Sequence, residues 1–288
     1  MWIALLAALP SCAAVGLFTD GTSVSLGSYN HGRLRHGARL PQKGEGYLCP
    51  PLWQERKNNY ATDELIKALR HAAARVRREY PGALLGIGDL SSRGGGRSIF
   101  HHSHENGRDA DLIYYAVDEH GRAVAPVSAM PRYLIAEGQA KAPSPSQHGA
   151  SFSDFSPRWF DLRRNWALVR ALLEEPSIEI QYLFIHNRLR DRLLAYAQSQ
   201  GESADLIDRA RELMRQPRDS LPHDDHLHVR IFCAPGDRAL GCVDRGPLWW
   251  LKKHYKYMLP RSAERALDEV VDRLTAVIAA LPCARVWL

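Results

Sequence analysis

Residues 226–232 read HLHVRIF, and polar and apolar side chains alternate through them with the two-residue period of a β-strand. In such a strand His226, His228 and Arg230 share one face, while the aliphatic residues between them share the other. Because the aliphatic face belongs in a core, the opposite face is predicted to present two neighbouring imidazoles. Neutral imidazoles are suitable ligands for Zn²⁺, and one ligand beside one base fits this pattern as well as two ligands.

A second group of histidines precedes this strand, where residues 100–111 read FHHSHENGRDAD. Gly107 lies between His104 and Asp111, so a turn at the glycine brings both side chains to one point. Asp111 also begins the apolar run DLIYYAV, in which an unpaired carboxylate is costly and a bound cation removes the cost. We therefore expect His104, Asp111 and one histidine of HLHVRIF to hold Zn²⁺, with the fourth position open to water as in catalytic zinc sites.

The rest of the chain alternates helical and strand patterns, which predicts an α+β fold. Its 288 residues, 45% hydrophobic and 24% charged, have the composition of one compact globular domain. Thr62 is the predicted N-cap of the first helix, and Asp161 stands at the start of the second. The expected helices cover residues 62–80, 161–173, 188–200, 203–215 and 262–280, and the expected strands cover 83–87, 111–117, 178–184 and 226–232.

The amino terminus is typical of an export signal. A short apolar run covers Trp2–Leu9, and small residues of the kind that a signal peptidase cleaves follow it. We therefore divide the chain into a leader over residues 1–24 and a single domain over 25–288, and expect the protein in the periplasm or cell envelope. Leu9–Cys12 also resembles a lipoprotein cleavage box, which makes a lipid anchor at Cys12 one alternative and a buried helical turn another.

The net charge of the chain indicates a class of partner but does not identify one. The chain has 38 Lys and Arg against 32 Asp and Glu, a net charge of +6, which favours anionic partners such as nucleic acid, membrane surfaces or wall polymers. We expect no nucleic-acid partner because no aromatic-basic recognition motif is present, and no membrane span because no apolar run reaches about 18 residues. Arg93 and Arg97, on either side of three glycines, are each either solvated or placed to meet a substrate carboxylate.

Apart from Cys12, the chain contains four cysteines, Cys49, Cys233, Cys242 and Cys283. An even number of cysteines in an exported domain predicts two disulfides, for which three pairings exist. No CxxC motif is present, so a cysteine zinc site is not expected, and the spacing of Cys233 and Cys242 suits a closed surface loop.

These motifs together resemble those of the penicillin-insensitive murein endopeptidases, in the lysostaphin, D-Ala-D-Ala metallopeptidase and hedgehog group of zinc peptidases. The similarity lies in SHENGRDAD at residues 103–111, in HLH at 226–228 and in GDLSSRGGG at 88–96, and it extends over about residues 27–242. It implies a small antiparallel sheet that holds the zinc site and is flanked by helices. The disulfides that it implies are Cys233 with Cys242 and Cys49 with Cys283.

The resemblance also implies roles for the residues of the site. The Zn²⁺ ligands match His104, Asp111 and His228, and His101 matches a histidine that relatives can use for a second metal. Asp225, three residues before His228, is part of a solvated turn, a hydrogen-bond partner of the site or a base. The catalytic residues that the resemblance implies are His226, the candidate general base, and His223, a further active-site histidine.

The function that the resemblance implies is zinc-dependent hydrolysis of the D-alanyl-diaminopimelate cross-links of peptidoglycan. No serine takes part in such a reaction, so the enzyme is insensitive to penicillin. Two other functions stay open. One is a D-Ala carboxypeptidase of the same zinc group that removes terminal residues from uncross-linked stems, and the other is a non-catalytic module that binds the cell wall or a metal.

Overall fold

The structure is a computed structural model that describes residues 21–127, 133, 157–218 and 220–246 of the chain. The predicted helix over residues 262–280 and most of the predicted leader, residues 1–20, lie outside the described residues. None of the described helices is long and apolar enough to cross a lipid bilayer.

A seven-stranded sheet forms the centre of the fold, with the strand order β13-β12-β14-β8-β7-β5-β4. Neighbouring strands are antiparallel except for two parallel pairs, β12 with β13 and β5 with β7, which helical segments connect. The predicted α+β class is confirmed, and the two strands with the site motifs pair antiparallel as expected. The strands of this sheet are β4 (Lys43–Gly44), β5 (Tyr47–Leu48), β7 (Leu85–Ile87), β8 (Asp109–Ile113), β12 (Ile180–Phe184), β13 (Met214–Arg215) and β14 (His226–Ile231).

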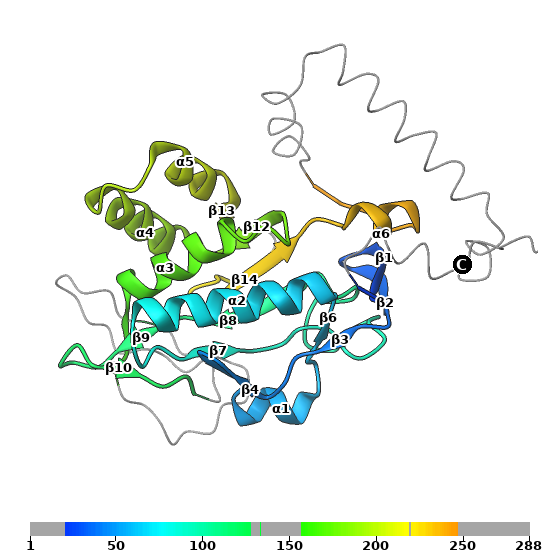
Figure 1. The fold of residues 1–288 in the computed structure, drawn as a ribbon, viewed down its shortest axis with the longest axis horizontal. Coiled ribbons are helices and arrows are strands. Elements are labelled where there is room, and N and C mark those ends of the chain that lie inside the picture. The colour runs from blue at the N-terminus through cyan, green and yellow to red at the C-terminus, as the bar shows by residue number, and fades with distance from the viewer. Residues whose placement is uncertain (1–20, 128–132, 134–156, 219, 247–288) are drawn as a thin grey trace, which may run out of the picture.

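Two helices, α2 and α3, lie side by side over one face of the sheet (Figure 1). Ion pairs join them, from Arg170 to Glu79 at 2.6 Å and from Arg75 to Glu174 at 2.5 Å. α4 and α5 lie beside α3 and form the connection between the parallel strands β12 and β13. The helices of the described chain are α1 (Pro51–Arg56), α2 (Asp63–Glu79), α3 (Leu162–Leu173), α4 (Asn187–Ser199), α5 (Ala204–Leu213) and α6 (Pro235–Ala239).

Short strand pairs extend the fold around the main sheet. The first strand lies beside α6 (Figure 1), because Gly27 N donates to Gly241 O at 3.0 Å and Val243 N donates to Gly27 O at 2.8 Å. The smaller sheets are β1 (Val24–Ser28) with β2 (His31–Arg35), β3 (Ala38–Arg39) with β6 (Tyr60–Ala61), and β9 (Ala116–Val117) with β10 (Ala123–Val124) and β11 (Trp159–Phe160).

The helix boundaries follow the signals in the sequence. The predicted helix over residues 62–80 is confirmed as α2, with Thr62 as its N-cap, although the Thr62 side chain makes no capping hydrogen bond. α3 begins after Asp161, as predicted, because the Asp161 side chain accepts hydrogen bonds from the backbone N–H groups of Arg163 and Arg164. The predicted helices that became α4 and α5 also agree to within two residues.

Alternation along β8 and β14 separates the core from the polar site, as predicted for HLHVRIF. Leu112 and Val229 are completely buried in the core that α2 and α3 cover, whereas Asp111 and His228 belong to the opposite face. That face is also buried, since no part of Asp111 and only 6% of His228 is exposed. The polar cluster therefore lies in a low-dielectric interior rather than on an open surface.

The predicted strand over residues 111–117 differs from the structure at both ends. β8 begins earlier, at Asp109, and it ends at Ile113. The strand breaks at Tyr115 because α3 and its N-cap take the Tyr115 backbone hydrogen bonds. The Asn165 side chain accepts from Tyr115 N at 3.0 Å and donates to Tyr115 O at 2.8 Å, and Asp161 N donates to the same oxygen at 3.1 Å. Asp109 therefore joins Asp111 on the polar face of the strand.

One of the implied disulfides is present. Cys233 and Cys242 are bonded, with 6.0 Å between their Cα atoms, and they link the end of β14 to the segment after α6. Cys49 is buried and bonds no other cysteine of the described ranges, and its implied partner Cys283 lies outside them.

Truncating Leu112 tests whether β8 is anchored by its apolar face. The Leu112→Ala variant is expected to lower the free energy of unfolding by about 2–5 kcal/mol, because the lost methyl groups leave a cavity under α2 and α3. Leu221→Ala is the control, since 71% of Leu221 is exposed, and it should change the value by less than about 0.5 kcal/mol. Urea denaturation measures both, and equal effects would contradict the assignment of faces.

Candidate metal centre

The register between β8 and β14 brings the two predicted halves of the site together. His228 is the direct cross-strand partner of Asp111, and Arg230 is that of Asp109. A shift of one residue would turn every one of these side chains to the other face of the sheet. The hydrophobic alternation of both strands therefore also determines where the polar groups meet.

A tight turn brings His104 to the same point, as expected from Gly107. Gly107 has φ +81°, and a Cβ there would lie 2.7 Å from Leu34 Cδ1, so only glycine fits. His104 itself has φ +65°, which is uncommon for a residue other than glycine. Ser91 holds this geometry, because its Oγ donates to His104 O at 2.5 Å and accepts from Gly107 N at 2.9 Å.

Four imidazoles turn a nitrogen towards the carboxylate of Asp111. The Oδ1 atom of Asp111 lies 3.3 Å from His104 Nε2, 3.2 Å from His228 Nδ1 and 3.5 Å from His226 Nε2. Its Oδ2 atom lies 3.8 Å from His101 Nδ1. Both oxygens are buried and neither accepts a hydrogen bond from a described residue. A buried carboxylate without hydrogen bonds is costly, so this arrangement fits a ligand better than a structural hydrogen-bond network.

The other nitrogen of each ring is bound to an acceptor. The pairs are His104 Nδ1 with Leu90 O at 3.1 Å, His228 Nε2 with Asp109 Oδ1 at 2.7 Å, His226 Nδ1 with Asp225 Oδ1 at 2.6 Å and His101 Nε2 with Asp89 Oδ2 at 2.9 Å. An acceptor at one nitrogen places the proton there, so the other nitrogen presents its lone pair towards Asp111. Metal-ligating histidines are oriented in this way.

Two of the acceptors are carboxylates balanced by arginines. Asp109 accepts from Arg230 Nε at 2.6 Å, and Asp89 accepts from Arg56 Nη1 at 2.6 Å. Burial alone raises the pKa of Asp109, but Arg230 and His228 outweigh it and hold the pKa below its usual range. Arg230 in turn lies 3.6 Å over the ring of Tyr29. These contacts fix the histidines from outside the cluster.

The charges within the polypeptide favour an ionised Asp111. Burial by itself raises the pKa of a carboxyl group, but the imidazoles of His104 and His226 outweigh it and hold the pKa of Asp111 well below its usual value. Burial also lowers the pKa of His226, but Asp111 and Asp225 more than compensate and raise this pKa to about 9. Asp111 is therefore an anion that attracts positive charge.

His223 lies on the β14 side of the cluster. Its ring centroid is 5.0 Å from that of His226 and 5.8 Å from that of His228, and its Nδ1 is buried without a hydrogen-bond partner among the described residues. Burial, followed by these two imidazoles, lowers the pKa of His223 to about 2, which keeps its ring neutral. Tyr114 holds the segment, because its hydroxyl donates to His223 O at 3.1 Å.

The donor atoms form two groups that could hold a cation, each with its atoms within 4.8 Å of one another. The groups are His101, His104 and Asp111, and His223, His226 and His228. Because His226 and His228 of the second group also face Asp111 of the first, all six side chains lie in one cluster. The chemistry of the set, buried imidazole nitrogens around an anionic oxygen, suits a divalent cation.

Sequence reasoning missed several residues that support the cluster. Asp109 could have been found, because it lies two positions before Asp111 and shares its face if the strand starts earlier. Asp89 stands in the GDLSSRGGG motif, but nothing local indicated that it would contact His101. Arg56 comes from α1, a distant segment without any signal. Asp225 was expected near the site, and the structure places it against His226.

The sheet and its cluster define a class of protein, an α+β fold that gathers imidazoles and a buried carboxylate into a candidate metal centre. Comparison with known proteins identifies the family. The chain belongs to the penicillin-insensitive murein endopeptidase family, whose model matches residues 25–249.

Curated relatives support the same placement at low identity. The chain is 24% identical over 252 residues to a protein named penicillin-insensitive murein endopeptidase from Klebsiella pneumoniae (strain 342), which covers 85% of this chain and 80% of the relative. It is 26% identical over 227 residues to a protein of the same name from Pectobacterium atrosepticum, which covers 78% and 69%. The similarity therefore spans most of each protein.

Neutralising Asp109 tests the outer carboxylates. The Asp109→Asn variant is expected to bind added Zn²⁺ about 10–100-fold more weakly, because His228 loses the anionic acceptor that orients its ring. Asp208→Asn on the exposed surface of α5 is the control and should bind as the wild type does. Calorimetric titration measures the affinity, and thermal unfolding separates loss of the fold from loss of binding. Unchanged Zn²⁺ affinity would show that Asp109 pairs with Arg230 but is not needed to orient His228.

Proposed function

We propose that the protein is a zinc-dependent endopeptidase that hydrolyses D-alanyl-diaminopimelate cross-links in peptidoglycan. The observation on which this proposal rests is the buried Asp111 carboxylate, which accepts no hydrogen bond from the described residues while imidazole nitrogens face it. Membership of the murein endopeptidase family, and the names of the curated relatives, support peptidoglycan as the substrate. The particular cross-link is part of the proposal.

In this proposal His104, Asp111 and His228 hold the zinc ion, and His101 is a further ligand on the other side of the carboxylate. One carboxylate and neutral imidazoles leave the site with a net positive charge. When bound, Zn²⁺ supplies Lewis-acid polarisation of the scissile carbonyl and makes water more acidic. Asp89 and Asp109 keep the rings of His101 and His228 in place through the bonds at their outer nitrogens.

His226 is proposed as the general base. Asp225 holds its Nδ1 at 2.6 Å. Asp111 and Asp225 favour a protonated ring in the polypeptide alone, and a divalent cation at Asp111 would offset this effect, so that Nε2 could accept a proton from the attacking water. The water oxygen bonds to the carbonyl carbon, the carbon–nitrogen bond breaks, and His226 returns the proton to the amine that leaves. His223, whose Nδ1 has no partner in the described chain, is placed to donate to the oxygen on which negative charge develops.

The cellular setting of the proposal follows from its substrate. A net charge of +6 favours association with the anionic cell wall. Zinc chemistry needs no serine nucleophile, so β-lactams have no target in this site. We propose a periplasmic or cell-envelope location, with residues 1–24 as a leader and a lipid anchor at Cys12 as the alternative to its removal.

Cleavage of purified cross-linked muropeptides tests the proposal. The wild-type protein should convert dimers to monomers, lose this activity with a zinc chelator and regain it with added Zn²⁺. Asp111→Ala should lower the rate by at least about 10³-fold because the anionic ligand is lost, whereas Asp208→Ala, an exposed site on α5, should leave it unchanged. Mass spectrometry of the digest measures the products.

Other products would reveal a different function. Loss of terminal D-Ala with intact dimers would identify a carboxypeptidase. Binding of one equivalent of zinc and of intact sacculi, with no cleavage of either substrate, would identify a non-catalytic module. Both results would overturn the proposed reaction.

Replacing His226 separates a base from a ligand. The His226→Gln variant is expected to lower kcat about 10²–10⁴-fold while its zinc content stays at the wild-type value, because general-base catalysis is lost without loss of a ligand. Zinc content is measured by mass spectrometry of the metal alongside the rate. Loss of zinc from this variant would instead make His226 a ligand, in agreement with its 3.5 Å approach to Asp111.

A further inference from the structure

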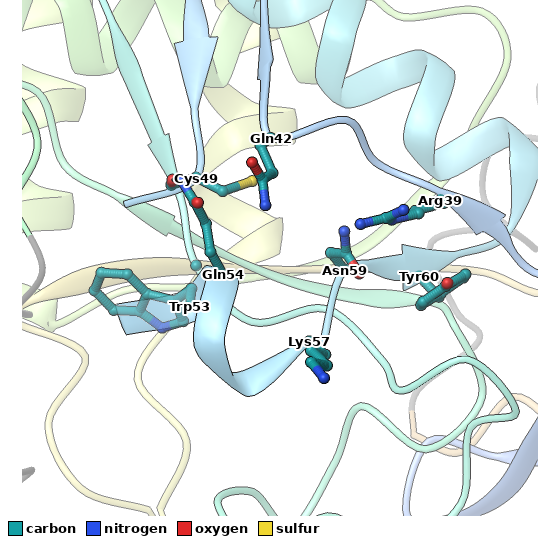
Figure 2. A pocket seen from close by; sticks show the side chains of 9 residues that line it. Arg39, Gln42, Cys49, Trp53, Gln54, Lys57, Asn59 and Tyr60 are labelled. Atoms are coloured by element: carbon teal, nitrogen blue, oxygen red, sulfur yellow. Dashed lines mark hydrogen bonds between the residues drawn. The ribbon is translucent and has the colours of Figure 1, made fainter. Parts of the chain in front are cut away.

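A basic groove, which we define by two hollows that meet at Tyr60, runs beside the candidate metal centre. One hollow, of about 260 Å³, is shown in Figure 2 and includes Arg39, Lys57 and Gly88 in its lining. The other, of about 560 Å³, is lined by His36, Gly37, Tyr60 and Arg93. The proposed reaction uses none of these residues.

The basic groove is separated from the metal centre by a single segment of chain. Gly88, in the lining of the smaller hollow, donates from its N to Asp111 O at 2.8 Å. Tyr60 N donates to Ser91 O at 3.0 Å, and the Ser91 side chain holds the backbone of His104. Residues 88–91 therefore have the candidate ligands on one side and the groove on the other, so a substrate held in the groove lies close to the site.

The lining of the groove is positively charged. Arg39, Lys57 and Arg93 belong to it, no Asp or Glu does, and none of these three cations pairs with an acidic residue of the described ranges. Their side chains are exposed and therefore available to a ligand. A single exposed cation contributes little to binding, because solvent and salt screen it, but several around one hollow add to a local positive potential.

The backbone fixes where these cations stand. Arg39 is the direct cross-strand partner of Tyr60 in the pairing of β3 with β6. Lys57, with φ +58°, is the C-cap residue of α1 and follows Arg56, which pairs with Asp89. Arg93 is the second residue of the turn from Ser92 to Gly95, in which Gly95 N donates to Ser92 O at 3.0 Å. The positive charges are thus presented from ordered segments.

The smaller hollow also contains a buried donor. The indole Nε1 of Trp53 is buried and has no hydrogen-bond partner among the described residues. A Cβ at residue 88 would come within 3.2 Å of this atom, so the glycine keeps the space beside it free. Tyr60 adds an aromatic wall to the hollow (Figure 2). An unpaired donor in a lining that also contains cations favours a ligand that offers oxygen acceptors.

We propose that the basic groove binds free carboxylates of the peptide stems that flank the scissile cross-link. This inference rests on the proposed function, because it names a subsite for the same substrate. Arg39 and Arg93 can each hold a carboxylate through paired N–H donors, and Lys57 adds a point charge between α1 and β6. In this proposal Arg93 contacts a substrate carboxylate, which is the second of the two roles that the sequence left open for it.

The test compares one peptide dimer with a form of it in which the carboxylates are amidated. For the wild type, amidation should raise KM about tenfold and leave kcat within about twofold, because the groove binds the ground state and the transition state equally. The triple variant R39Q/K57Q/R93Q should show the raised KM with the unmodified dimer and less than a twofold further rise on amidation. Its KM should also lose the salt dependence of the wild type.

A control variant and contrary results test the proposal for the basic groove separately from the proposed reaction. The double variant K67Q/R188Q removes two exposed cations of α2 and α4 and should behave as the wild type does. The proposal would be wrong if the triple variant had the KM of the wild type, or if amidation raised its KM as much as it raises that of the wild type. Tight binding of a phosphate-bearing wall polymer at these cations, with unchanged dimer kinetics, would overturn it too.

Failure of the proposed function gives a different result. If the wild type does not cleave the dimer, calorimetric binding of the uncleaved dimer and its amidated form is measured with the same three proteins. Weaker binding after amidation in the wild type alone supports the groove even without the reaction, whereas equal binding in all three proteins overturns it.

Discussion

The carboxylate of Asp111 is fully buried, and it can stay ionised there only because imidazoles surround it. Leaving water is so costly for a carboxylate that its neighbours must supply compensating charge. The pairing of β8 with β14 supplies His228, and the turn at Gly107 supplies His104. The arrangement of the sheet, with helices on the other face, is what makes this polar interior possible.

Charge alternates outward from this centre. The anion at Asp111 faces imidazoles, the imidazoles face the carboxylates of Asp89, Asp109 and Asp225, and arginines pair with two of these. Each layer determines the orientation of the one inside it, because a carboxylate fixed by a guanidinium is itself a fixed acceptor. The outer arginines come from α1 and β14, so elements distant in the sequence contribute to a single site.

Much of this architecture could be predicted from local patterns. The alternation in HLHVRIF identified the polar face of β14, and the glycine between His104 and Asp111 indicated the turn. The break after β8 could not be predicted, because it depends on Asn165, which binds the Tyr115 backbone from α3. Arg56 was missed for the same reason, since its role depends on a contact 33 positions away along the chain. Tertiary contacts of this kind produce no local pattern in the sequence.

The backbone hydrogen bonds between β1 and the segment after α6 have a consequence for the order of folding. Gly27 is held by backbone bonds to Gly241 and Val243, and β8 completes its pairing only with β14, more than a hundred residues later. During vectorial synthesis β8 can pair with β7 at once, but its other edge stays unpaired until almost the whole described sequence has emerged. Assembly of the cluster is therefore a late event, and a partly made chain contains His101, His104 and Asp111 without the histidines of the β14 segment.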